Sequence, residues 1–73
     1  MTKTEATRAV KKQLRAAGLG NYKVRSETCC GPGVLTSVAG EPELLREALN
    51  SLPGVAKLHE LSLSVVVQWE VAS

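Results

Sequence analysis

The sequence predicts an α+β fold, a two-layer sandwich in which two helices cover one face of an antiparallel sheet. Three observations predict it: two segments with apolar residues at helical spacing, two strand-like segments joined by a Gly-Pro-Gly turn, and a strongly alternating C-terminal segment. The expected order is helix, strand, strand, helix, and then one or two strands. The 73 residues form a single domain, residues 1–73.

The first helix is expected to begin after Thr2 or Thr4, because either side chain can cap its first turn. Glu5 in that turn suits the positive end of the helix dipole. Gly18 tolerates the left-handed conformation that commonly follows a helix, which sets the expected end. The residues between them are good helix formers, and their apolar stripe is Ala6, Val10, Leu14 and Ala17.

Residues 21–30 alternate as a strand, and residues 34–39 form the returning strand of a hairpin. The Gly-Pro-Gly segment at 31–33 marks the turn between them. On a regular strand, Cys29 and Cys30 point to opposite faces of the sheet. Antiparallel pairing of these two strands follows from the short connection.

The second helix is expected to start at Pro42, which suits the first helical position, and to stop at Pro53-Gly54. Its apolar stripe is Leu44, Leu45, Ala48, Leu49 and Leu52. Residues 61–71 then alternate strictly and predict a strand with one buried face. The extended residues 55–59 are out of phase with that strand. No Gly, Asn or Pro, which tight turns commonly use, lies near His59. This absence favours one long bulged strand over two strands joined by a tight turn.

The run Leu52-Pro53-Gly54-Val55, followed by an alternating strand, resembles part of the heavy-metal-associated domain family. In that family too, a helix ends at Pro-Gly-Val and leads into a strand. The resemblance covers about twenty residues and implies a ferredoxin-like sheet, or a permuted form whose first strand has moved to the end of the chain. The family's metal loop, with two cysteines separated by two residues, is missing, so no metal site carries over.

The net charge is +2, from nine Lys and Arg against seven acidic residues. The bases are concentrated in the first 25 residues, where Glu5 is the only acid. This asymmetry favours either a solvated helix face or a surface that attracts an acidic partner. The candidate partner-binding residues of this basic part are Lys11, Lys12, Arg15, Lys23 and Arg25.

Cys29 and Cys30 are the only cysteines, and three interpretations remain open for them. They can be small structural side chains, contacts between copies of the chain, or thiolates that react or bind a soft metal such as Cu(I). They are therefore the candidate metal ligands, and no other cofactor is expected. The single imidazole, His59, has a sequence neighbour, Glu60, that would point the opposite way on a strand. We therefore expect no catalytic set and no enzyme.

The outward face of the terminal strand is weakly charged, and at a sheet edge it would accept an added strand. The candidate partner-binding residues there are Ser62, Ser64, Val66 and Gln68. We therefore expect a small non-enzymatic protein-interaction module, of accessory or inhibitor type, that binds through this edge and the basic helix face.

The expected partner is another protein or a second copy of the chain rather than nucleic acid. The alternatives are a soft-metal or thiol-active protein centred on Cys29 and Cys30, and a weak nucleic-acid binder. Without a long apolar run or an apolar leader, we expect a cytoplasmic protein with no membrane partner.

Overall fold

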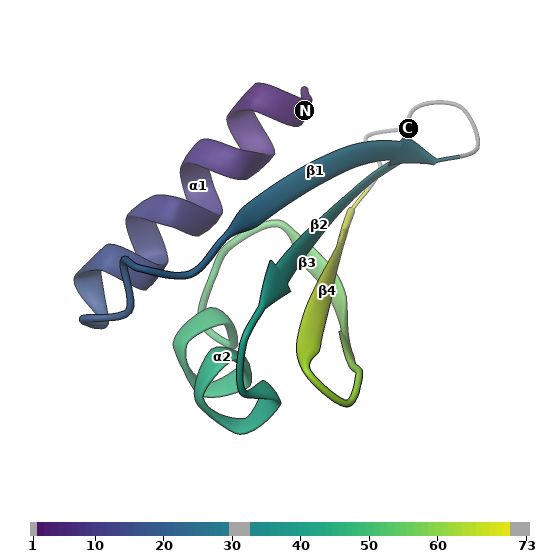
Figure 1. Ribbon diagram of the computed structural model, residues 1–73. Coiled ribbons are helices and arrows are strands. Elements are labelled where there is room, and N and C mark those ends of the chain that lie inside the picture. The colour runs from purple at the N-terminus through teal and green to yellow at the C-terminus, as the bar shows by residue number, and fades with distance from the viewer. Residues whose placement is uncertain (1, 30–32, 71–73) are drawn as a thin grey trace.

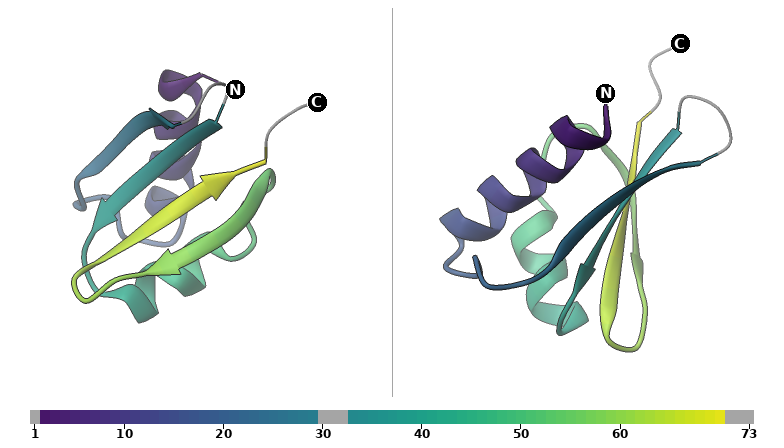
Figure 2. Two further views of the ribbon diagram at one scale, coloured as in Figure 1. Left: turned by 90° about the vertical axis from the view of Figure 1, so that its right-hand side faces the viewer. Right: turned by 45° about the horizontal axis from the view of Figure 1, so that its top comes forward.

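The structure, a computed structural model, describes residues 2–29 and 33–70. These residues form an α+β fold with two helices and a four-stranded antiparallel sheet (Figure 1). Both helices lie on the same side of the sheet, and the other side is open (Figure 2). The elements in chain order are α1 (Lys3–Ala16), β1 (Val24–Cys29), β2 (Gly33–Ala39), α2 (Pro42–Leu49), β3 (Val55–Glu60) and β4 (Ser64–Trp69).

Both ends of α1 are closed by the hydrogen bonds that its sequence predicts. Of the two candidate threonines, Thr2 is the cap: its Oγ1 accepts from the Glu5 N–H, and Glu5 Oε1 accepts from the Thr2 N–H, both at 3.1 Å. At the other end, Gly18 has a φ of 78°, and the Leu19 N–H donates to the Leu14 carbonyl at 2.7 Å. The chain therefore leaves α1 in a fixed direction toward β1.

The strands lie in the order β1-β2-β4-β3, and every neighbouring pair is antiparallel. The expectation that the terminal strand forms a sheet edge is therefore wrong. β4 lies between β2 and β3, so its backbone groups are paired on both sides. Ser62 lies in the turn before β4, and Ser64, Val66 and Gln68 belong to this central strand, where no edge is free for strand addition. The edges of the sheet are β1 and β3.

The expectation of one long bulged strand over residues 55–71 is also wrong, because a tight turn at 61–63 separates β3 from β4. The turn closes through backbone hydrogen bonds and needs no Gly, Asn or Pro. The Leu61 N–H donates to the Ser64 carbonyl at 2.8 Å, and the Leu63 carbonyl accepts from Gly40 at 2.9 Å. Leu61 and Leu63, which the alternating pattern places in the core, are 52% and 77% exposed.

The core lies between the two helices and the covered face of the sheet. α1 contributes Ala6, Val10 and Leu14 of its predicted stripe, whereas Ala17 of that stripe lies after the helix and is exposed. α2 contributes Leu45 and Leu49, while Leu44 of its predicted stripe is exposed. α2 ends at Leu49, before the expected stop, and Leu52 is buried in the loop that follows. The sheet contributes Val34, Val38, Val65, Val67 and Trp69.

One polar side chain lies among these apolar residues. Thr36 of β2 is fully buried, and its Oγ1 accepts a hydrogen bond of 2.8 Å from the Trp69 indole Nε1–H. Because an indole N–H can only donate, burying Trp69 requires an acceptor in the core. Thr36 supplies it across the β2–β4 pair.

Thr36→Val should destabilise the protein, because it keeps the shape of the side chain and leaves the Trp69 N–H unpaired in the core. The expected loss in the free energy of unfolding is about 1–3 kcal/mol. Urea denaturation followed by Trp69 fluorescence measures it. Thr28→Val, at an exposed threonine of β1, is the control and should change stability far less. Equal stability of Thr36→Val and the parent would contradict the role given to this hydroxyl.

Gly40→Ala should also destabilise the fold, because a Cβ at this position would overlap the ring of Tyr22. The aromatic ring cannot move without losing its packing, so we expect a cost of about 1–3 kcal/mol. Gly20→Ala is the matched control, since no atom lies closer than 3.9 Å to a Cβ placed there. The melting temperatures of the two variants measure this difference. Equal melting temperatures would contradict the expected overlap with Tyr22.

Candidate functional site

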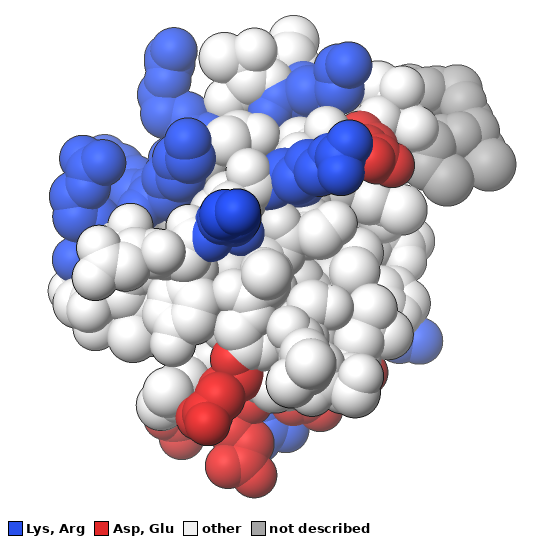
Figure 3. All heavy atoms as spheres, in the orientation of Figure 1, with Lys and Arg blue, Asp and Glu red and all other residues white. Residues whose placement is uncertain are grey.

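A surface hollow of about 730 Å³ runs along α1 beside β1, and we call it the α1–β1 hollow. Its charged lining consists of Lys3, Arg8, Lys11, Lys12 and Arg15. Its uncharged polar lining consists of Thr4, Thr7 and Ser26. In Figure 3, Lys and Arg side chains gather over the half of the molecule that holds α1. No acidic or apolar side chain belongs to the lining.

The packing of α1 explains why its cations gather on one surface. Its apolar residues, one turn apart, point into the core, so the remaining positions of the same turns point outward. Arg8, Lys11 and Arg15 follow one another at helical spacing on that outer surface. The single glutamate of α1, Glu5, is held at the helix start by its two hydrogen bonds with Thr2.

Among the described residues, the cations of the hollow form no ion pair, and their acidic neighbour on α1, Glu5, is held by Thr2. The ion pairs of the described residues are Arg25–Glu27, at 3.7 Å, and Arg46–Glu60, at 3.5 Å, and neither includes a hollow residue. Acidic side chains gather at the opposite end of the molecule, over α2 (Figure 3). Although the net charge is only +2, the positive and negative side chains are concentrated at opposite ends of the molecule. The electrostatic potential over the hollow is therefore positive.

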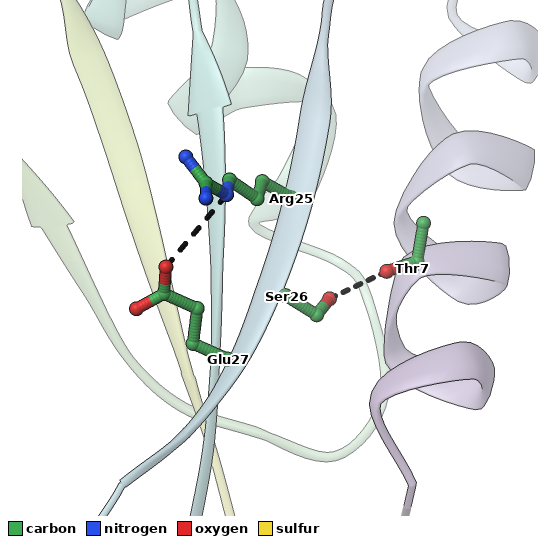
Figure 4. A network of polar contacts seen from close by, with 4 residues as sticks. All are labelled: Thr7, Arg25, Ser26 and Glu27. Atoms are coloured by element: carbon green, nitrogen blue, oxygen red, sulfur yellow. Dashed lines mark hydrogen bonds and ion pairs between the residues drawn. The ribbon is translucent and has the colours of Figure 1, made fainter.

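The structure brings together three of the five basic residues that the sequence singles out. Lys11, Lys12 and Arg15 line the hollow, whereas Lys23 and Arg25 do not. Arg25 lies on the far side of β1 from α1 and pairs there with Glu27 (Figure 4). Adjacent strand residues point to opposite faces, so Arg25, next to Ser26 in β1, points away from the helix that Ser26 contacts.

Sequence reasoning missed five residues of the lining: Lys3, Thr4, Thr7, Arg8 and Ser26. The helical spacing contains a signal for two of them, since Lys3 and Arg8 share outward positions with Lys11, Lys12 and Arg15. The threonines and Ser26 carry no such signal, because only the docking of α1 on β1 makes them neighbours.

A chain of hydroxyl groups leads from the hollow into the core, and we call it the hydroxyl chain. Thr7 Oγ1 of α1 lies 2.6 Å from Ser26 Oγ of β1 (Figure 4). Ser26 Oγ lies 2.9 Å from Thr36 Oγ1, which accepts from Trp69. Four elements, α1, β1, β2 and β4, are therefore joined by one line of side-chain hydrogen bonds.

The predicted metal site at Cys29 and Cys30 falls partly outside the described residues. Cys29 ends β1, and Cys30 lies beyond the part of the chain that the structure describes. Within residues 2–29 and 33–70, no three His, Cys, Asp or Glu side chains gather as metal ligands. His59 lies on the open face of the sheet, with its Nε2 2.9 Å from Gln68 Oε1. The metal site stays a prediction.

Among the described residues, neither helix has the length and apolar character to cross a membrane. Comparison of the chain with protein-family models, with curated proteins and with solved structures found no match. A function for this chain therefore has to follow from its own residues.

The start of α1 should respond to acid through Glu5. Hydrogen bonds from the Thr2 backbone and side chain hold the pKa of Glu5 below its ordinary value of 4.5, and Arg8 acts in the same direction. Because the pKa of Glu5 is lowered in the folded protein, its carboxylate stabilises the fold fully when the pH is above the ordinary pKa. This stabilisation is lost as the pH falls through the lower pKa of the folded protein. Urea denaturation at pH 7 and at pH 3 should show a smaller acid-induced loss of stability for Glu5→Gln than for the parent.

Glu47→Gln, at an exposed glutamate of α2, is the control and should keep the acid-induced loss of the parent. If Glu5→Gln loses as much stability between the two pH values as the parent does, the capping interaction does not carry the effect.

Proposed function

We propose that this chain is a small non-enzymatic binding module that holds the phosphate backbone of nucleic acid in the α1–β1 hollow. The observation that carries the proposal is the composition of the lining: five cations and three hydroxyl side chains with no acid. Lys, Arg, Ser and Thr are the side chains that contact phosphate oxygens in protein–nucleic acid complexes. A concentrated positive potential also speeds the association of a polyanion.

The lining favours nucleic acid over the protein partner that the sequence alone suggests. The centres of protein–protein interfaces are enriched in aromatic residues, methionine and arginine and depleted in lysine. The hollow contains two arginines, no aromatic residue, no methionine and three lysines. Its chemistry suits a partner whose surface is uniformly anionic.

The sheet edges also argue against a strand-adding protein partner. With β4 in the centre, the edges of the sheet are the six-residue strands β1 and β3. β1 carries Arg25 and Glu27, and β3 carries Lys57 and Glu60. Short edges with charged side chains resist the addition of another strand. The basic surface of α1 is therefore the better supported half of the predicted interface.

We expect this binding to depend little on base sequence. Bases in single strands are read largely by stacking on aromatic rings, and the lining of the hollow contains no aromatic side chain. Trp69 is only 2% exposed, and Tyr22 packs over Gly40. The contacts available are charges and hydroxyls, which position a backbone and carry no direct sequence information.

For the fold, we infer a permuted ferredoxin-like arrangement in two layers. Moving the first strand of a ferredoxin-like chain to its end gives the order α1, β1, β2, α2, β3, β4. The same move converts the strand order of that fold into β1-β2-β4-β3, which is the order of this sheet. The agreement supports a fold and carries no function with it.

The affinity for a 12-nucleotide single-stranded DNA should fall steeply as the salt concentration rises. In a plot of the logarithm of the association constant against the logarithm of the salt concentration, each phosphate contact should contribute about 0.7 to the downward slope. Lys11→Ala with Lys12→Ala should weaken binding and lower that slope by about 1.4, because two phosphate contacts are lost. Fluorescence anisotropy at salt concentrations from about 50 to about 200 mM measures both the affinity and the slope.

Lys57→Ala with Lys23→Ala is the matched control, since it removes two lysines that lie outside the hollow. The control should keep nearly the parent slope. A flat salt response of the parent, or equal losses in the two double variants, would exclude the hollow as a phosphate-binding surface.

A further inference from the structure

Building on the proposed function, we propose that the outer end of the hydroxyl chain, Thr7 with Ser26, is the specific site of one phosphate group within the hollow. The general positive potential attracts a polyanion anywhere along α1. This site instead supplies a directed hydrogen bond at one place. Whether a donor is free at this place depends on where the hydroxyl protons of the chain lie.

The chain contains four protons that can be donated and only three hydrogen bonds. The protons belong to the Trp69 indole and to the hydroxyls of Thr36, Ser26 and Thr7. The bonds are Trp69 to Thr36, Thr36 with Ser26, and Ser26 with Thr7. The first uses the indole proton, because the indole nitrogen cannot accept. Two hydroxyl protons fill the other two bonds, and one hydroxyl proton is left over.

The spare proton cannot lie on Thr36 without a penalty. Thr36 is fully buried, and among the described residues the acceptor within reach of its hydroxyl is Ser26 Oγ. A buried donor without an acceptor is costly, so Thr36 donates to Ser26. The spare proton then lies on Ser26 or on Thr7, depending on which of the two donates to the other. Both residues line the hollow.

The positions of the nearest cations fit a phosphate at this point. Lys3 and Lys11 lie four residues before and after Thr7 on α1, so they are on the same face of the helix, about one turn away on each side. Both belong to the lining of the hollow. A phosphate oxygen that accepts the spare O–H would therefore have a lysine on either side, which is the arrangement of charge and donor that phosphate recognition uses.

The site predicts that one hydroxyl controls affinity without changing the charge. Thr7→Val removes the hydroxyl and keeps the shape of the side chain, so we expect binding of the 12-nucleotide DNA to weaken about ten-fold. The salt slope should stay that of the parent, because no cation is lost. Thr28→Val is the matched control: Thr28 is an exposed threonine of β1 outside the hollow, so the affinity of this variant should equal that of the parent.

A second measurement uses the parent protein and needs no variant. The DNA should shift the NMR resonance of the Trp69 indole N–H, because a phosphate that accepts from Thr7 or Ser26 fixes the direction of the bond between these two residues and polarises the hydrogen bonds that connect it to Trp69. Inorganic phosphate should compete with the DNA only at far higher concentration. If it binds as tightly as the DNA, the site takes free phosphate, and the nucleic-acid assignment is overturned.

The outcomes separate this site from the proposed function. If the parent binds DNA with a steep salt dependence and Thr7→Val binds equally well, the phosphate site is overturned and the binding function stands. An unchanged indole resonance in the DNA complex overturns the site in the same way. A parent that does not bind DNA overturns both.

Discussion

The packing of the α1 apolar stripe against the sheet is the constraint on which the rest of the structure depends. Ala6, Val10 and Leu14 are at most 1% exposed and fix the rotation of the helix about its own axis. With that rotation set, the cations of the same turns have to face solvent together. The basic surface of α1 is therefore a consequence of how the core is filled.

The hydroxyl chain adds a polar element to this apolar contact. Apolar packing alone tolerates small slips of a helix along a sheet, whereas the 2.6 Å contact between Thr7 and Ser26 is made at one position only. Thr36 connects that contact to Trp69, the one aromatic side chain of the buried core in the described residues. The single buried threonine thus accepts the hydrogen bond of the Trp69 indole and connects it, through Ser26, to Thr7 in the hollow. This line of hydrogen bonds joins the hollow to the interior of the protein.

The features that sequence reasoning predicted correctly are local ones. The cap at Thr2, the stop at Gly18 and the start of α2 at Pro42 depend on residues within a turn of one another. The turn between β3 and β4 was missed because backbone hydrogen bonds close it, and such bonds do not require particular residue types. The central position of β4 was missed because strand order is set by tertiary packing. The hydroxyl chain joins residues 19 and 33 positions apart, a distance that no local pattern covers.

Mapping of the backbone amides by NMR during titration with a 12-nucleotide DNA shows which surface of the protein the DNA contacts. If the α1–β1 hollow holds the phosphate backbone, the shifted resonances cluster along α1 and around Ser26, and the open face of the sheet is unaffected. Val66 and His59 of that open face serve as internal references, since they lie on the side of the sheet away from both helices. Shifts centred on these residues, with α1 unchanged, would contradict the account.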